Sequence, residues 1–312
     1  MDWLNAHKQE LDDVFAEANQ IVSTFPAPLN LLGLAYLAKF DASKEGTTKN
    51  YICYLLPYWM KDACNLPATE IQKLSLANVF IMLYYFIQDD IMDSAKGEHK
   101  DKLPLANLFH TQFSAIYRDM FPSSSPFWRY YETYILEWSE AVSNEQTSDY
   151  FHTDRNKIAK KASPVKNAST AALLLSQQAA LIPAVTEAVE QVLVTLQMLD
   201  DWADWEEDIE EGSYNCLLAS MRKRMQLPAD SIITAETVKD QLFVRDFLET
   251  YGQIAAAHHE DLFNLQSSLP QMISFHKSLV TNIQIVEQEI KEKRKKLASG
   301  GFYYFLSESR NN

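Results

Sequence analysis

Residues 78–93 read NVFIMLYYFIQDDIMD, an apolar run that ends in three aspartates. Nearly every residue from Asn78 to Gln88 is apolar, which predicts a helix that is buried on all sides. Because a helix turns about 100° per residue, Asp89 and Asp93 lie one turn apart on the same face. The apolar run would carry these carboxylates inward at the end of a core helix.

A second aspartate cluster follows in the sequence LQMLDDWADWEED at 196–208. Asp200, Asp204 and Asp208 are spaced so that one helix places them on one face. Carboxylates at this spacing repel, which costs stability unless a cation lies between them. Oxygen ligands without neighbouring His or Cys suit Mg²⁺ better than Zn²⁺. Two such helices facing each other would hold several Mg²⁺ ions and form a receptor for a diphosphate.

Acidic clusters also occur in helical proteins that bind no diphosphate. A single acidic cluster is most often a solvated helix face, but two clusters that each follow an apolar run argue against solvated faces here. A ferritin-like di-iron site requires Glu-x-x-His pairs on two helices. The chain contains no such pair, and His258-His259-Glu260 has the wrong spacing.

Helical periodicity continues along the whole chain, which has only 7 glycines among 312 residues. So few glycines argue against the tight turns of a β-rich or Rossmann-like fold. With no repeat and no linker rich in Pro, Gly or Ser, the sequence predicts one all-α domain, 1–312, of about ten to twelve helices. The expected helices include 4–24, 29–40, one from 67 through the first cluster, 183–212 and 270–297.

The chain is acidic, with a formal net charge of −14 at pH 7, which argues against nucleic acid as a partner. Cys53, Cys64 and Cys216 match no zinc spacing and predict inert thiols in a reducing compartment. The polar first residues are unlike a signal peptide, and the longest apolar run, 79–87, is too short to span a bilayer. We therefore expect a cytoplasmic protein with no transmembrane segment.

The first cluster resembles the first aspartate-rich motif, DDxxD, of the trans-isoprenyl diphosphate synthases. The second resembles the family's second motif, in which a glutamine, here Gln197, shortly precedes DDxxD. GTTKN at 46–50 is similar in position to the family's Gly-Gly-Lys-Arg-type sequence, and Lys166 to its mid-chain lysine that contacts diphosphate. The resemblance extends from Gly46 to Asp208 and implies the all-helical isoprenoid synthase fold.

The sequence departs from the chain-elongating members of that family at the site for the second substrate. Those enzymes follow the first motif with an Arg-Arg pair, whereas 94–99 read SAKGEH, and the arginine expected after Lys49 is Asn50. Glu and Asn cannot replace guanidinium groups that bind a diphosphate. The residues that would bind the allylic diphosphate are kept, whereas the basic residues that would bind isopentenyl diphosphate are not. The chain therefore looks like a prenyltransferase-like terpene synthase of class I.

This resemblance implies an enzyme that ionises an allylic prenyl diphosphate to a carbocation and releases a terpene and diphosphate. It also implies a homodimer and about three Mg²⁺ ions, for which Mn²⁺ is the expected substitute, to stabilise the leaving group. Tyr84 and Tyr85 stand where bulky residues limit chain length in the family, which favours C10 or C15 substrates over C20. Trp202 and Trp205 are candidates to shield the cation. The alternatives are a short-chain trans-prenyltransferase and a non-catalytic subunit of the same fold.

The expected site combines metal ligands with groups that contact the prenyl diphosphate. Class I terpene synthases bind a metal through residues at the spacing of Asp200, Asp204 and Asp208, and often place a diphosphate-sensing arginine near the position of Arg155. The expected metal ligands are Asp89, Asp90, Asp93, Asp200, Asp204 and Asp208, of which Asp89, Asp93, Asp200 and Asp204 are the catalytic set. The expected substrate-binding residues are Lys49, Tyr84, Tyr85, Arg155, Lys166 and Gln197.

Overall fold

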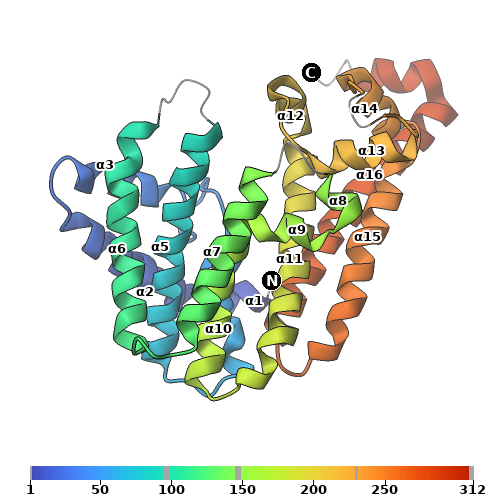
Figure 1. Cartoon of the computed structure of the whole chain (residues 1–312). Helices are drawn as coiled ribbons and strands as arrows, with labels where there is room; N and C mark the ends of the chain where they lie inside the picture. Colours follow the sequence, from blue (N-terminus) through green and yellow to red (C-terminus); the bar gives the residue numbers. More distant parts are fainter. Residues whose placement is uncertain (1, 94–98, 145–148, 229–230, 309–312) are drawn as a thin grey trace. The chain divides into compact units, whose positions relative to one another are not determined.

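The computed structural model describes the backbone of residues 2–93, 99–144, 149–228 and 231–308, and their side chains except at 2, 93 and 297–308. Within this part of the chain the fold is all-α, with no strand (Figure 1). Thirteen of the helices described have seven or more residues, slightly more than the ten to twelve expected. The all-α prediction is confirmed.

Contacts along the chain divide it into two compact units. The first consists of Met1–Trp138, Ala162–Val189 and Leu265–Met272, and the second of Ser139–Lys161, Glu190–Asn264 and Ile273–Asn312. The helices α7, α11 and α16 contribute residues to both units. The expectation of a single domain over 1–312 stays a prediction.

The first unit is built around α5, which packs against α2, α4, α6 and α10. Residues 78–83 and Ile87 are buried, whereas Tyr84, Tyr85 and Phe86 are half-buried, so the predicted all-sided burial is confirmed only for the middle of this helix. Figure 1 shows α5 and α6 side by side. The helices that lie wholly in this unit are α1 (Asp2–Asn5), α2 (Lys8–Ser23), α3 (Leu29–Ala38), α4 (Tyr51–Trp59), α5 (Ala68–Asp93), α6 (Leu103–Met120) and α10 (Lys166–Leu175).

The second unit carries the second aspartate cluster, at the junction of α11 and α12. Gly212, with φ of 74°, ends α12 in the left-handed conformation that glycine adopts without strain. The helices that lie wholly in this unit are α8 (Tyr150–Thr153), α9 (Asn156–Ala159), α12 (Trp205–Glu211), α13 (Cys216–Arg224), α14 (Ala235–Phe243) and α15 (Phe247–Asp261). The three shared helices are α7 (Phe127–Ser143), α11 (Ile182–Ala203) and α16 (Pro270–Glu308).

Three helix boundaries differ from the sequence-based expectation. The first expected helix is two, α1 and α2, and α16 extends eleven residues past the expected end at Leu297. The third difference is a break at Asp204, which separates α11 from α12. Periodicity alone missed this break because the apolar spacing continues across it.

Membrane and cysteine expectations have different outcomes. Among the described residues, Ala179–Ala203 is long and apolar enough to cross a membrane, but the core helices of soluble proteins meet the same criterion, and 44% of its apolar 18-residue window is buried. The absence of a transmembrane segment therefore stays a prediction. All three cysteines are buried free thiols. Burial raises the pKa of Cys53 to about 12, which keeps that thiol protonated and unreactive.

Candidate functional site

The first aspartate cluster lies at the C-terminal end of α5. Asp89 is exposed and Asp90 is half-buried. The Asp90 carboxylate accepts hydrogen bonds from Lys102 Nζ at 2.8 Å and from Tyr36 Oη at 3.2 Å. Burial and the charge of Asp90 raise the pKa of Tyr36, so its hydroxyl remains a donor. Asp93 ends the helix, and its side chain lies outside the described residues. Asp89 therefore presents the more accessible carboxylate, while Asp90 is neutralised by a lysine.

The second aspartate cluster spans the junction of α11 and α12. Backbone hydrogen bonds of 3.0 Å from Asp204 N to Asp200 O, and from Asp208 N to Asp204 O, keep the four-residue spacing across the break. Asp200 and Asp204 are exposed and Asp208 is half-buried. Partial removal from water, followed by repulsion from Asp204 and Asp201, raises the pKa of Asp200 to about 6. The predicted repulsion between these carboxylates is therefore present, although they do not lie on one continuous helix.

Asp201 has a structural role in the same cluster. Its side chain is buried and accepts hydrogen bonds from Cys216 N at 2.6 Å and from Gln197 Nε2 at 2.7 Å. It thereby binds a backbone N–H at the N-terminus of α13, where such groups lack partners within the helix. Gln197 donates to Asp201 and, at 3.5 Å, to Asp200 Oδ2, and its expected contact with substrate stays a prediction.

The carboxylates suit Mg²⁺ by chemistry but do not form a cage. No three His, Cys, Asp or Glu side chains among the described residues are close enough together to ligate one metal ion. Mg²⁺ at phosphate-binding sites usually keeps several waters and takes one or two carboxylates plus phosphate oxygens. The exposed carboxylates of each cluster, Asp89 in the first and Asp200 and Asp204 in the second, fit that kind of site, in which phosphate oxygens complete the coordination.

Lys166, expected to contact diphosphate, is fully buried in the first unit. Its Nζ lies 2.6 Å from Glu137 Oε2, which also accepts a hydrogen bond of 2.8 Å from Ser163 Oγ. The ammonium also lies over the ring of Tyr134, 4.6 Å from its centroid. A buried ammonium requires such a partner, so this lysine stabilises the interior of its unit.

Lys49, the other lysine expected at the substrate, binds its own loop. Its Nζ donates to the carbonyl oxygens of Asp41 at 3.2 Å and Ala42 at 3.3 Å, and also contacts Lys44 O and Thr47 Oγ1. The charge of Lys49 is therefore used to fold the segment that precedes α4.

A basic segment of the second unit contains Arg155, an expected substrate-binding residue, and Lys161, which the sequence pattern did not single out. Arg155 is exposed, and its guanidinium lies over Phe151, 5.2 Å from the ring centroid. Lys161 lies six residues further, and its positive charge lowers the pKa of both Asp200 and Asp201 against the larger effect of burial. The run of lysines from 157 to 166 was the available signal, and only the fold distinguishes Lys161, near the aspartates, from Lys166.

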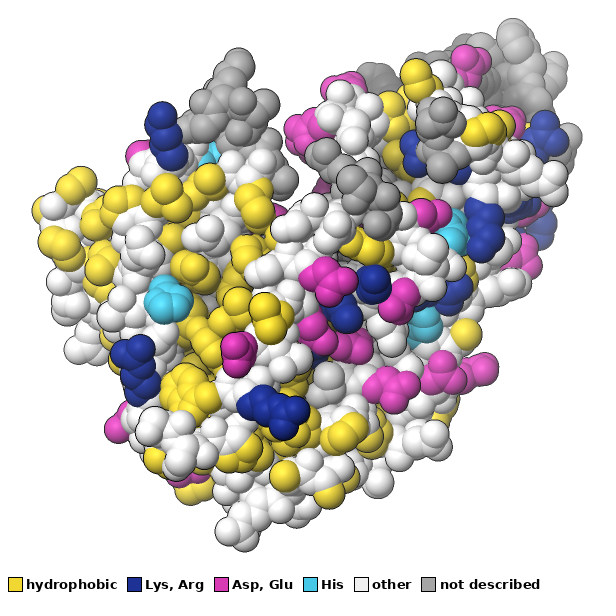
Figure 2. All heavy atoms as spheres, viewed as in Figure 1, with side chains coloured by type: hydrophobic (Ala, Val, Ile, Leu, Met, Phe, Trp, Pro, Cys, Tyr) yellow, Lys and Arg dark blue, Asp and Glu magenta, His cyan; other side chains and the backbone are white. Residues whose placement is uncertain are grey.

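Tyr84 and Tyr85 lie in an aromatic cluster of the first unit. Their rings meet edge to face with centroids 4.9 Å apart, and Tyr84 contacts Phe113 at 5.8 Å while Tyr85 contacts Trp138 at 4.8 Å. Burial raises the pKa of both tyrosines, so both rings are neutral. Figure 2 shows hydrophobic side chains gathered on the face of this unit. The two half-buried tyrosines thus form part of an aromatic cluster about one turn before Asp89.

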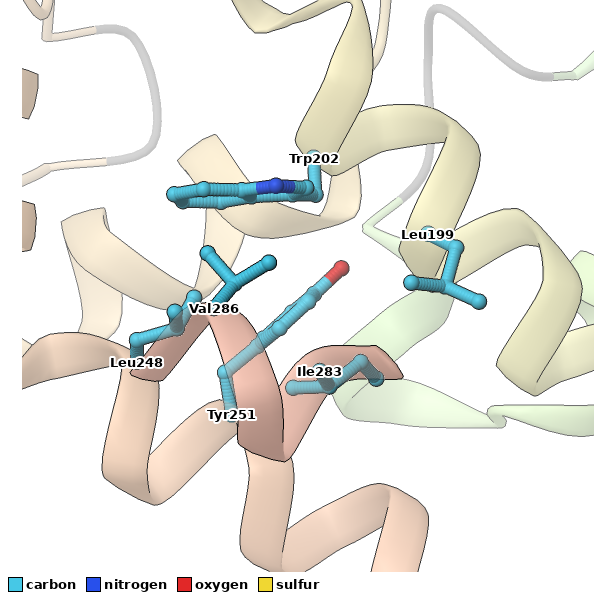
Figure 3. Close-up of a pocket in the computed structure, with 6 residues that line it drawn as sticks. All are labelled: Leu199, Trp202, Leu248, Tyr251, Ile283 and Val286. Atoms are coloured by element: carbon cyan, nitrogen blue, oxygen red, sulfur yellow. The ribbon is translucent and has the colours of Figure 1, made fainter. Parts of the chain in front are cut away.

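A small apolar pocket in the second unit adjoins the second cluster. Figure 3 shows the Trp202 indole lying over Tyr251 and Val286. Its cavity volume of about 10 Å³ is far below the range of roughly 300–1,000 Å³ that is typical of pockets that enclose a small molecule. The lining residues are Leu199, Trp202, Leu248, Tyr251, Ile283 and Val286. Trp202, expected to shield a carbocation, therefore packs against α15 and α16 around a hollow too small for a prenyl chain.

No protein family matches this chain, and no curated protein has a significantly similar sequence.

Proposed function

We propose that this chain is a Mg²⁺-dependent class I terpene synthase, which converts one allylic prenyl diphosphate to a terpene and diphosphate. The observation that carries the proposal is the place of the acidic residues. Asp89, Asp90 and Asp93 lie in the last turn of α5, and Asp200 and Asp201 lie in the last turn of α11, while Asp204 and Asp208 continue the four-residue spacing into α12. The backbone dipole is negative at the C-terminal end of a helix, so the carboxylates of Asp89 and Asp200 are each unfavourable there by about 0.3–1 kcal/mol before mutual repulsion is added. Stability alone does not account for this arrangement, whereas cation binding reverses both costs.

Two aspartates are better assigned to support than to metal binding. Asp90 is paired with Lys102, and Asp201 bonds to Cys216 and Gln197. This leaves the ions to the remaining expected ligands, which are Asp89, Asp93, Asp200, Asp204 and Asp208. Mg²⁺, when bound, supplies the positive charge that neutralises diphosphate as a leaving group.

The basic residues assigned to diphosphate also change. Lys166 and Lys49 are each bound within the first unit, whereas Arg155 is exposed and Lys161 acts on the second cluster. We assign Arg155 and Lys161 to hold the diphosphate once its bond to the allylic carbon breaks. Charge-assisted hydrogen bonds to the phosphate oxygens then prevent its return.

The aromatic cluster that contains Tyr84 and Tyr85 is assigned to the prenyl chain. Neutral aromatic rings exclude water and present π faces to a carbocation without reacting as phenolate nucleophiles. Their position next to the first cluster favours C10 or C15 substrates. Lys49, the lysine of the expected second-substrate site, is engaged by carbonyl groups, which argues for the synthase over the prenyltransferase.

A product analysis tests the proposal. Purified protein is incubated with Mg²⁺ and C10, C15 or C20 allylic diphosphates, each with and without isopentenyl diphosphate. The expected result is a terpene from an allylic substrate alone, lost in Asp89→Asn and Asp200→Asn. Glu207→Gln is the matched control, because Glu207 is an exposed acidic residue of the second cluster outside the ligand spacing.

The remaining outcomes identify the alternatives. Longer prenyl diphosphates that form only with isopentenyl diphosphate would identify a prenyltransferase. No turnover, together with no effect of Mg²⁺ and inorganic diphosphate on thermal stability, would identify a non-catalytic subunit, because a ligand that binds only the native state must stabilise it.

A further inference from the structure

Asn215 connects the N-terminus of α13 to the second aspartate cluster. It is buried, with 1% of its surface exposed, and is the N-cap residue of α13. Its Oδ1 accepts a hydrogen bond of 3.1 Å from Leu218 N. Its Nδ2 donates to Asp208 Oδ2 and to Asp201 O, both at 2.7 Å. The Asn215 side chain thus caps α13 and also donates hydrogen bonds to two residues of the second aspartate cluster.

The cap alone does not require asparagine. An N-cap needs only an acceptor, which Asp, Ser and Thr supply about as well. The amide differs because it adds two N–H donors to that acceptor. An aspartate at position 215 would bring a second negative charge against Asp208. The donors toward Asp208 and Asp201 are therefore what this position gains from asparagine.

Asp208 depends on this contact for its orientation. It belongs to α12, which has seven residues and begins directly after the break at Asp204. A helix shorter than about 12–15 residues is marginal without tertiary contacts. The hydrogen bond from Asn215 fixes Oδ2 of the carboxylate and leaves Oδ1 for a cation.

We propose that Asn215 is a positioning residue, which orients the Asp208 carboxylate for Mg²⁺ and couples the N-terminus of α13 to the metal site. The inference rests on the proposed function, because it takes Asp208 as a Mg²⁺ ligand. Outer residues that hold a metal ligand by hydrogen bonds typically contribute about 10–100-fold to metal affinity.

Two substitutions separate positioning from capping. Asn215→Ser keeps a capping acceptor but is too short to reach Asp208, and Asn215→Asp keeps the cap while replacing the donor with a charge. Thr234→Ala is the matched control: it removes the N-cap of α14, where Thr234 Oγ1 accepts from Thr237 N at 3.2 Å in the same unit. Asp208→Ala removes the metal ligand itself.

The readout is thermal unfolding as Mg²⁺ is increased at a fixed concentration of inorganic diphosphate. Both Asn215 variants should need roughly 10–100-fold more Mg²⁺ for half of the full stabilisation. Thr234→Ala should lower the Tm measured without metal and leave that Mg²⁺ concentration unchanged.

Two results would overturn the inference, and they are distinguishable. If Asp208→Ala loses the Mg²⁺ response while both Asn215 variants keep the wild-type midpoint, Asn215 is only a cap and the proposed function stands. If the wild-type protein shows no stabilisation by Mg²⁺ and diphosphate, the proposed function fails and the inference fails with it.

Discussion

Replacing Lys166 by methionine tests whether this lysine stabilises the fold or binds substrate. Its ammonium is fully buried 2.6 Å from Glu137 Oε2, and the Glu137 side chain is 22% exposed. Removing one partner of a buried ion pair costs about 3–5 kcal/mol, because the remaining charge loses its nearest compensating charge. Glu137 keeps the hydrogen bond from Ser163 and some access to water. We therefore expect the lower end, about 3 kcal/mol.

The measurement is a double-mutant cycle by urea unfolding near neutral pH. Lys166→Met should lower the free energy of unfolding strongly, and adding Glu137→Gln should restore at least half of the loss, because no charge is then buried alone. The double variant should also bind Mg²⁺ and inorganic diphosphate as the wild type does. The reasoning is wrong if Lys166→Met stays within about 0.5 kcal/mol of wild type, as surface substitutions do. It is also wrong if the double variant is stable but loses diphosphate binding.

Buried or crowded groups give three further predictions. Asp200→Asn should raise the free energy of unfolding without metal near neutral pH, because desolvation and repulsion hold the pKa of Asp200 near 6. The same substitution should abolish the stabilisation by Mg²⁺, whereas Glu207→Gln should leave that stabilisation intact. Burial lowers the pKa of His276 to about 3, so below its ordinary value of 6.5 only the unfolded chain takes up the proton. The free energy of unfolding should then fall by up to about 1.4 kcal/mol per pH unit as the pH drops below 6.5. The urea midpoint of His276→Gln should depend less on pH than that of the wild type. The same dependence of the urea midpoint on pH in both proteins would contradict this. Gly33→Ala should lower the Tm and cost about 1–3 kcal/mol, because the added Cβ would come within 2.7 Å of Val22 Cγ1; an unchanged Tm would show that the neighbouring helices yield easily.

The helices themselves were largely predictable from local sequence. Pro67 and the apolar run that follows predicted a helix ending in the first aspartates, and α5 spans Ala68–Asp93. Pro270 likewise marks the start of α16. The break at Asp204 was not predicted, because no glycine or proline marks it. The extension of α16 past Leu297 was not predicted, because Gly300 and Gly301 were expected to end the helix, whereas the helix continues through them.

The candidate site was predictable from the sequence only in part. The sequence by itself determined which residue types carry negative charge, their four-residue spacing on α5 and across α11 and α12, and hence their repulsion, because these follow from helix geometry. Only the tertiary structure decided the partners: Asp90 takes Lys102, Asp201 takes the backbone of Cys216, and Lys166 takes Glu137. These partners are separated by 12 to 29 residues, and the cost of burying a charge depends on which groups the fold brings within hydrogen-bonding distance.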